Sequence, residues 1–320
     1  MKKLAVFFLL LACGLSASAW GFFAHRRINR MAVFTLPPEL FSFYKYHLRF
    51  IEENAVNADR RRYAVEGEAA HHYIDLDAYG DSALHKLPRR WNDAVEKFSE
   101  DTLLKYGTVP WHINAMRYRL TEAFRERNVK KILLHSTDLG HYIADAHVPL
   151  HTTQNYNGQL TGQHGIHGFW ESRLPELYSD NYNFFFARAR YLDSPLESAW
   201  QAVASANAAL DSVLRMEREL TLKFGEDRKY SFEERNGLPS KVYAQEFALA
   251  YHKVLNGQVE RQMRASIQMI GNFWFTCWVD AGQPDLAPLM RPLNQVEQQE
   301  LEREMEEWKK VSLRVRNEED

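Results

Sequence analysis

The sequence is poor in cysteine, which limits how the fold can be held together. Among 320 residues there are two cysteines, Cys13 and Cys277. Cys13 lies in an N-terminal segment that we expect to be removed, so Cys277 would stand alone and no internal disulfide could form. For a chain that we expect to be exported, the fold must then depend on its hydrophobic core. A bound metal would help, because the binding energy of a structured site adds to the folding energy.

A surplus of basic residues is also missing. The chain has 40 Lys and Arg against 42 Asp and Glu, a formal net charge of −2, and loss of Lys2 and Lys3 would make it −4. Proteins that hold nucleic acid or anionic membranes by electrostatics carry a basic excess, so the composition gives no support to that class. Beyond the N-terminal segment there is no apolar run long enough to cross a membrane, no internal repeat and no low-complexity tract.

Residues 1–19 have the features of a signal peptide. A positively charged start precedes the apolar run 4–12, and the small residues 17–19 form a cleavage site. The apolar run is shorter than the about 20 residues that span a bilayer. We expect cleavage after Ala19, which leaves Trp20 as the first residue of a periplasmic or extracellular protein. A lipoprotein box ending at Cys13 is an alternative, but residues 17–19 are the clearer site.

The pattern of apolar residues is helical almost throughout, with Gly and Pro sparse inside the periodic stretches. We therefore predict an all-α protein, with a single helical-bundle domain at 20–290 and a charged tail at 291–320. The tail is expected to form a solvated helix or a frayed end over 294–310. A polar loop is expected at 152–166. Helices are predicted at 20–36, 40–56, 91–106, 111–128, 129–147, 196–222 and 240–279.

Two pairs of imidazole and carboxylate occur at helical spacing. His141 and Asp145 are four residues apart and so project from one helical face, and His167 and Glu171 repeat this arrangement. His151 lies between the pairs, beyond a proline that must end the helix. Such donors are those that zinc prefers. A single such pair is common on the surface of a helix, but two pairs within about 30 residues, with His151 between them, predict a metal site.

Further candidate ligands occur nearer the N-terminus. Asp59 is followed by His72 in a His-His-Tyr-Ile-Asp segment, and His25 lies five residues after Trp20. A free α-amine has a pKa near 7.7–8.0, so beside a cation it deprotonates readily and can bind zinc. The carbonyl oxygen of Trp20 could close a five-membered chelate. Cleavage of the signal peptide would then create a ligand.

The order of these residues resembles the zinc-dependent phospholipase C superfamily, which also contains the zinc-dependent single-strand nucleases of fungi and plants. The family pattern is Trp, His, Asp, His, His-x3-Asp-x5-His and His-x3-Asp/Glu, and it is filled in order by this chain. The matching residues are Trp20, His25, Asp59, His72, His141, Asp145, His151, His167 and Glu171.

The resemblance implies three zinc ions. One ion would be bound by His72, His141 and Asp145, with Asp59 either coordinating or just outside. A second would be bound by the Trp20 amine and carbonyl and by His25, with Asp145 bridging to the first. The third would be bound by His151, His167 and Glu171. Asp59 is also the candidate for orienting or deprotonating the attacking water.

Three functions remain open from the sequence. The favoured one is a phosphodiesterase like phospholipase C, which releases a phosphorylated head group from a phospholipid or acts on a related phosphodiester. The alternative is a single-strand nuclease that also removes 3′-phosphates, and the third is a zinc-binding protein without turnover. Glu171 in place of Asp and the short spacing between His151 and His167 are features of the phospholipases, whereas Trp170 before the carboxylate is a feature of the nucleases. The oligomeric state is not predicted.

One departure from the family concerns head-group choice. The choline-preferring members carry an acidic residue and two aromatic residues where this chain has Phe23, Arg60 and Ala69. A quaternary ammonium group needs aromatic faces and negative charge, which these residues hardly supply. Arg60 and Arg61 are instead candidates to receive an anionic or phosphorylated group. We therefore predict weak activity on phosphatidylcholine.

Overall fold

Prolines and capping side chains mark where the principal helices begin. In the computed structural model of the chain, residues 21–235 and 237–313 are described. The predicted signal peptide and Trp20 lie outside this part. Pro110 and Pro195 occupy first-turn positions of two long helices, where the missing N–H costs nothing. The Asn128 side chain accepts a hydrogen bond from the Lys131 N–H and caps the helix that carries the site.

The elements of the bundle are bounded as follows. The first half contains α1 (Phe22–Ala32), α2 (Pro38–Tyr46), α3 (Leu48–Glu53), α4 (Asn57–Arg61), α5 (Ala83–Lys86), α6 (Trp91–Phe98), α7 (Glu100–Tyr106), α8 (Val109–Arg125) and α9 (Val129–Asp145). The second half contains α10 (Ile166–Gly168), α11 (Leu174–Tyr178), α12 (Pro195–Phe224), β1 (Tyr230–Arg235), β2 (Leu238–Tyr243), α13 (Gln245–Val254), α14 (Gln258–Asp280) and α15 (Gln295–Trp308).

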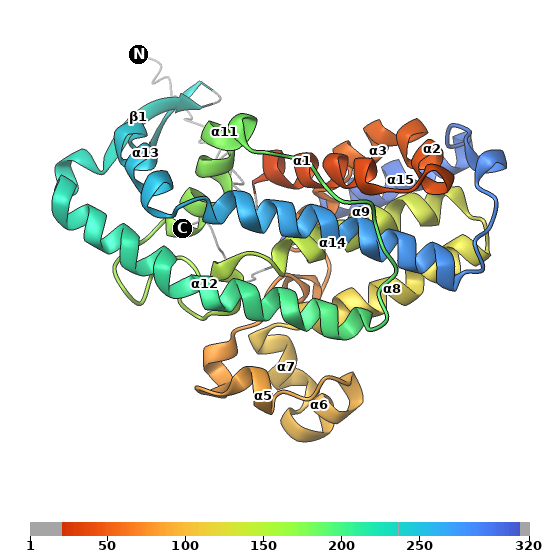
Figure 1. Cartoon of the computed structure of the whole chain (residues 1–320), viewed down its shortest axis with the longest axis horizontal. Helices are drawn as coiled ribbons and strands as arrows, with labels where there is room; N and C mark the ends of the chain where they lie inside the picture. Colours follow the sequence, from red (N-terminus) through yellow and green to blue (C-terminus); the bar gives the residue numbers. More distant parts are fainter. Residues whose placement is uncertain (1–20, 236, 314–320) are drawn as a thin grey trace, which may run out of the picture.

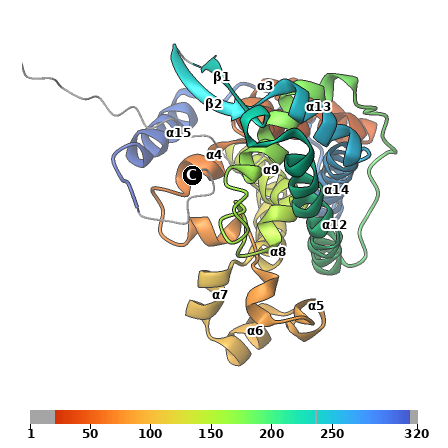
Figure 2. The same cartoon turned by 90° about the vertical axis from the view of Figure 1, so that its left-hand side faces the viewer.

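Five helices form the frame around the buried centre. α9 packs against α1, α8 and α14, and α12 packs along α8 on the other side. The long helices α12 and α14 run along the length of the molecule, while α5, α6 and α7 form a lobe at its edge (Figures 1 and 2). Within the frame, the ring of Trp274 stacks on Tyr44 at a centroid separation of 4.6 Å. Trp274 donates to the Ser136 carbonyl, so even the large core aromatics are hydrogen-bonded.

The predicted all-α class is confirmed, with one local exception. β1 and β2 form a two-stranded antiparallel hairpin in which Tyr230 pairs with Tyr243, where a linker and the start of a helix were predicted. The predicted helix over 240–279 is therefore wrong at its start, and it is divided into α13 and α14. Gly257 adopts a left-handed φ of 74° at this division, a conformation that glycine adopts without strain.

The C-terminal helix α15 is attached to the bundle. An N-terminal capping box joins Asn294 and Glu297, which explains why a highly charged segment is helical here. Lys130 on α9 forms ion pairs with Glu300 and Glu304 of α15, at 2.8 and 3.4 Å. The segment is thus a docked helix with a solvated outer face, and assigning 291–320 as a separate tail remains a prediction.

Candidate metal centre

The C-terminal half of α9 carries the centre. Its last two turns are buried and include His141 and Asp145, which share one helical face as their spacing predicts. His141 Nε2 lies 3.2 Å from Asp145 Oδ2. Gly140 lets α1 approach this face, because a Cβ at that position would lie 2.1 Å from Asn29 Oδ1. The Asn29 amide in turn donates to the His25 carbonyl, so the close approach fixes the α1 residue that faces Asp145.

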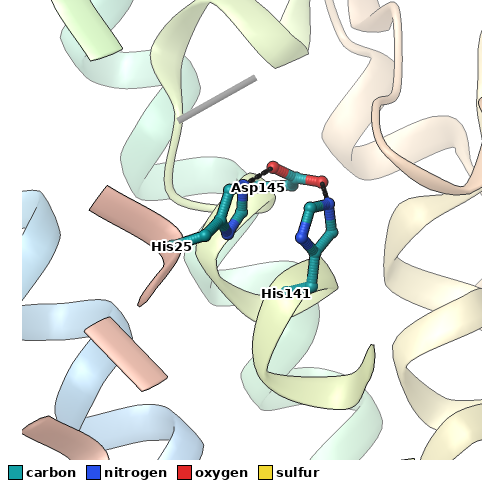
Figure 3. Close-up of side chains that lie close together, drawn as sticks. All are labelled: His25, His141 and Asp145. Atoms are coloured by element: carbon teal, nitrogen blue, oxygen red, sulfur yellow. Dashed lines mark ion pairs between the residues drawn. The ribbon is translucent and has the colours of Figure 1, made fainter. Parts of the chain in front are cut away.

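Asp145 lies between two imidazoles and uses a different oxygen for each (Figure 3). Its Oδ1 is 3.4 Å from His25 Nε2, and its Oδ2 faces His141. The rings of His25 and His141 are stacked, with centroids 3.8 Å apart and an angle of 13° between planes. These three residues form one group whose donor atoms converge closely enough to hold a cation. A carboxylate whose two oxygens face different imidazoles could bridge two cations.

A second group shares His141 with the first. It contains Asp59 from α4, His72 and His141, all buried. His141 Nε2 lies 3.1 Å from His72 Nδ1 and 3.4 Å from Asp59 Oδ1. His72 Nδ1 also lies 2.9 Å from Asp145 Oδ2. The two groups are therefore adjacent parts of one centre.

The third group consists of His151, His167 and Glu171, again all buried. His167 Nε2 lies 3.0 Å from His151 Nε2 and 2.9 Å from Glu171 Oε2. Glu171 lies in a short π-helical segment, Phe169–Arg173, that directly follows α10, and π-helical turns are frequent at functional sites. This group adjoins the other two, since His151 Nδ1 is 3.8 Å from Asp145 Oδ1.

Backbone carbonyls orient two of the imidazoles. His141 Nδ1 lies 2.8 Å from the Ala55 carbonyl, and His151 Nδ1 lies 2.7 Å from the His72 carbonyl. A carbonyl only accepts, so in each ring Nδ1 must carry the hydrogen, and in the neutral form Nε2 presents a lone pair to the centre. This is the outer support that metal-binding histidines ordinarily have.

Neighbouring charges within the centre shift the pKa values of its side chains strongly. Burial opposes ionisation of His141, but Asp59 and Asp145 raise its pKa well above the ordinary value. Burial also opposes ionisation of Asp145, yet His141 and His151 hold its pKa well below the ordinary range. His25 differs, because burial and the neighbouring His141 lower its pKa. The carboxylates are thus ionised and need positive charge beside them.

The residues fit a metal ion. Both carboxylate oxygens of Asp59 are buried and accept no hydrogen bond from the described residues. Burying ionised carboxylates without compensation is costly, and a cation between imidazole lone pairs and carboxylates would supply that compensation. Mixed nitrogen and oxygen donors in groups of three suit zinc with a position left open. Three buried groups that could each bind a metal are therefore present, made by eight of the nine predicted residues.

A polar network behind His72 was not predicted. Glu68 Oε1 lies 3.9 Å from His72 Nε2 and also accepts hydrogen bonds from Arg61 and Tyr142. Arg61 pairs in addition with Asp138 at 3.1 Å. The hypothesis that Arg61 receives an anionic group is therefore not supported, because its guanidinium is engaged by two carboxylates. The spacing of Glu68 and His72, again four residues, was the signal that could have shown this contact.

The other histidines lie outside the three groups. His71 stacks on His112 with centroids 3.6 Å apart, and His252 stacks on Tyr178. His47 is buried against Phe43, with ring centroids 4.8 Å apart. His147 is buried, and its Nδ1 lies 2.7 Å from the Ile143 carbonyl. It belongs to none of the three groups, whereas His151 lies in the third.

No protein-family model matches this sequence, and no curated protein matches it. The fold is similar to the crystal structure of the alpha-toxin of Clostridium perfringens from avian strain SWCP. That similarity has a TM-score of 0.46 and 11% sequence identity, and it covers 85% of this chain and 66% of that chain. Among the described residues, no helix is both long and apolar enough to span a bilayer.

Proposed function

We propose that this chain is an exported, zinc-dependent phosphodiesterase that acts like a phospholipase C on a phospholipid or related phosphodiester. The observation that carries the proposal is the adjacency of three buried imidazole–carboxylate groups, two of which share His141. Asp145 lies next to all three groups, within 3.8 Å of His25, His141 and His151. Closely spaced cations suit the displacement of a phosphate ester, in which negative charge develops on several oxygens at once.

The residues divide the task of holding three ions. His72, His141 and Asp59 would hold one, and His151, His167 and Glu171 another. His25 and Asp145 would hold the third with the amine and carbonyl of Trp20, which lies outside the described residues. Bound zinc supplies Lewis acidity, which lowers the pKa of water towards about 7 and offsets charge on phosphoryl oxygens. Asp145 would contribute to more than one of these positions, because its two oxygens face different imidazoles.

Asp59 is the proposed base or orienting group for the attacking water. Burial would raise its pKa, but His141, His25 and His72 lower it, so the carboxylate stays ionised and able to accept a proton. A carboxylate with no hydrogen bond from its surroundings also has lone pairs available for a water molecule or an ion. Asp59 is therefore proposed both to contact a metal and to assist catalysis.

We propose a phospholipid as the substrate in preference to nucleic acid, for two reasons. Trp170, the residue that resembles the nucleases, is fully buried and donates to the Gln258 side chain at 3.0 Å. It is therefore a core residue and offers no surface on which a base could stack. The chain also lacks the basic excess typical of nucleic-acid binding.

The test combines metal analysis with a substrate panel. The purified, processed protein is analysed for metals by mass spectrometry and assayed on a soluble phosphodiester, several phospholipids and single-stranded DNA, each with and without chelator. We expect bound zinc, chelator-sensitive hydrolysis of the soluble ester and of a phospholipid, and low activity on phosphatidylcholine. Efficient cleavage of DNA without lipid hydrolysis would identify the nuclease alternative.

The third possibility, a zinc-binding protein without turnover, is separated by the same panel. It requires stoichiometric zinc and no hydrolysis of any phosphodiester. Absence of both zinc and hydrolysis would overturn the proposed function entirely. An Asp59→Asn variant tests the role of Asp59. It should lose most activity, while the third group, formed by His151, His167 and Glu171, keeps its metal.

A further inference from the structure

Two arginines adjoin ligands of the candidate centre. Arg26 follows His25 on α1, and Arg60 follows Asp59 on α4. Both side chains are half-buried. The Arg60 guanidinium carbon lies 5.6 Å from the centre of the Phe22 ring, so Arg60 reaches across to the first turn of α1. Arg60 therefore lies over the start of α1, the helix that carries Arg26.

Neither guanidinium is neutralised by a carboxylate of the described residues. Arg60 Nη1 donates to the Asn57 side chain at 3.1 Å, which is a neutral partner. Arg26 Nε is buried and has no hydrogen-bond partner in the described part of the chain. Burial of donors without acceptors is unfavourable, and arginine is rarely buried unless it is paired. The guanidinium N–H groups of Arg26 and Arg60 can therefore donate to an anionic ligand.

Neighbouring arginines on the same helices show the usual arrangement. Arg27 pairs with Asp180 at 2.6 Å, and Arg30 pairs with Glu52 at 2.5 Å. Arg61, next to Arg60, is held by two carboxylates. The lack of acidic partners at Arg26 and Arg60 is therefore particular to the two positions beside the centre.

The two positive charges also act on each other. Phe22, whose ring Arg60 contacts, and Arg26 are four residues apart on α1 and so share one helical face, which places the two guanidinium groups near each other. Holding two like charges together is unfavourable in the free protein. An anion between them would remove the repulsion and satisfy the open donors, and guanidinium groups match the geometry of phosphate oxygens.

We propose that Arg26 and Arg60 bind a second phosphate group of the substrate, beside the phosphodiester that the metal centre would cleave. This inference rests on the proposed function and narrows it to phosphodiesters that carry an additional phosphate monoester. The group can belong to a phosphorylated lipid head group or to the terminal phosphate of a nucleotide. Both sources present the same chemistry to the arginines.

Binding is measured first, so that the inference does not depend on turnover. Calorimetry with the zinc-loaded, processed protein compares inositol 1,4-bisphosphate with inositol 1-phosphate. We expect the bisphosphate to bind at least about tenfold more tightly, since each charge-assisted contact contributes on that order. The preference should fall towards unity in Arg26→Gln/Arg60→Gln. Arg27→Gln is the matched control, because Arg27 already has an acidic partner, and this variant should keep the preference for the bisphosphate.

Hydrolysis then distinguishes the two sources of the phosphate. Phosphatidylinositol is compared with phosphatidylinositol 4-phosphate, and the dinucleotide TpT with its 5′-phosphorylated form. Within each pair, kcat/KM for the substrate with the additional phosphate is divided by kcat/KM for the substrate without it. The source of the phosphate is the pair for which this ratio falls in the double variant. Equal binding of the two inositol phosphates by the unaltered protein, or an undiminished preference in the double variant, overturns the inference. If no phosphodiester is hydrolysed, the proposed function fails, while the calorimetry still decides the role of the arginines.

Discussion

Asp145 is the residue at which the interactions of the centre converge. Its carboxylate lies 2.9 Å from His72, 3.2 Å from His141, 3.4 Å from His25 and 3.8 Å from His151. It is fully buried, so its negative charge depends on these neighbours and on any ion among them. Because the side chain faces several imidazoles, its loss should affect more than one metal position.

We therefore predict that Asp145→Asn lowers the zinc content by at least one ion per chain and abolishes most activity. The amide has the same shape but no charge, and loss of even an outer partner of a ligand costs about 10–100-fold in affinity or activity. Metal analysis and the phosphodiester assay check this. His147→Gln is the control, since His147 is buried two residues away but belongs to none of the three groups. Full zinc content in Asp145→Asn would contradict the bridging role.

Trp20 provides a second prediction at this scale. Its neighbour Gly21 is buried, and the Gly21 N–H donates to Ser172 Oγ at 3.1 Å, one residue beyond Glu171. The described chain therefore begins beside the centre. The Trp20 amine is the proposed ligand, and one residue added ahead of Trp20 would remove that ligand, so we expect loss of one zinc and a large fall in activity. Unchanged zinc content and rate, measured against the processed protein, would show that the amine is not a ligand.

At the scale of elements, the contact between α1 and α9 sets the distance between His25 and His141. Gly140 is the point of closest approach, where an added Cβ would lie 2.1 Å from Asn29 Oδ1 and 2.9 Å from its Cγ. Asn29 is fully buried, so it has little room to move. A side chain at 140 must therefore displace α1 from the helix that carries Asp145.

Gly140→Ala should lower zinc affinity and activity although it changes no ligand. Overpacking of a buried contact costs about 1–3 kcal/mol, which in this size range is several degrees of unfolding temperature. Calorimetric unfolding and zinc titration measure the two effects. Gly168→Ala is the matched control, because a Cβ there meets no atom within 4 Å although the residue lies next to His167. Equal behaviour of the two variants would show that the close approach is unimportant.

The helices and most of the site could be predicted because their signals are local. His141 and Asp145 meet because of helical periodicity, and Pro149 ends the predicted helix near where α9 stops. The hairpin was missed because its stability comes from outside the strands: Tyr243 stacks on Phe169 with ring centroids 3.7 Å apart. Likewise, Lys229 pairs with the buried Glu217 at 2.7 Å, and nothing in either segment indicates this contact.

For the whole molecule, the centre links metal binding to folding and to pH. Without a cation, the buried carboxylates depend on a protonated His141, whose pKa is raised above its ordinary 6.5. A raised histidine pKa stabilises the folded state fully below about 6.5, and this contribution is lost as the pH rises through the folded-state pKa. The lowered pKa values of Asp59 and Asp145 act in the opposite sense and remove stability only in acid. In the metal-free protein the contribution of His141 is therefore present in mildly acidic solution and lost at higher pH, while His25, whose pKa is lowered, acts against folding in acid.

Chelation should accordingly lower the unfolding temperature more at pH 8 than at pH 6. Bound zinc replaces the proton as the compensating charge, and it competes better when the imidazoles are neutral. A ligand at about 1,000 times its Kd contributes about 4 kcal/mol, and about 1.6 °C per kcal/mol for a chain of this length gives a shift of roughly 6–7 °C. Scanning calorimetry of the processed protein with and without chelator measures this shift, and added Zn²⁺ should reverse it. Asp145→Asn should show a smaller shift, because it holds less metal. A shift that is equal at the two pH values would mean that proton and metal do not compete for the same imidazoles.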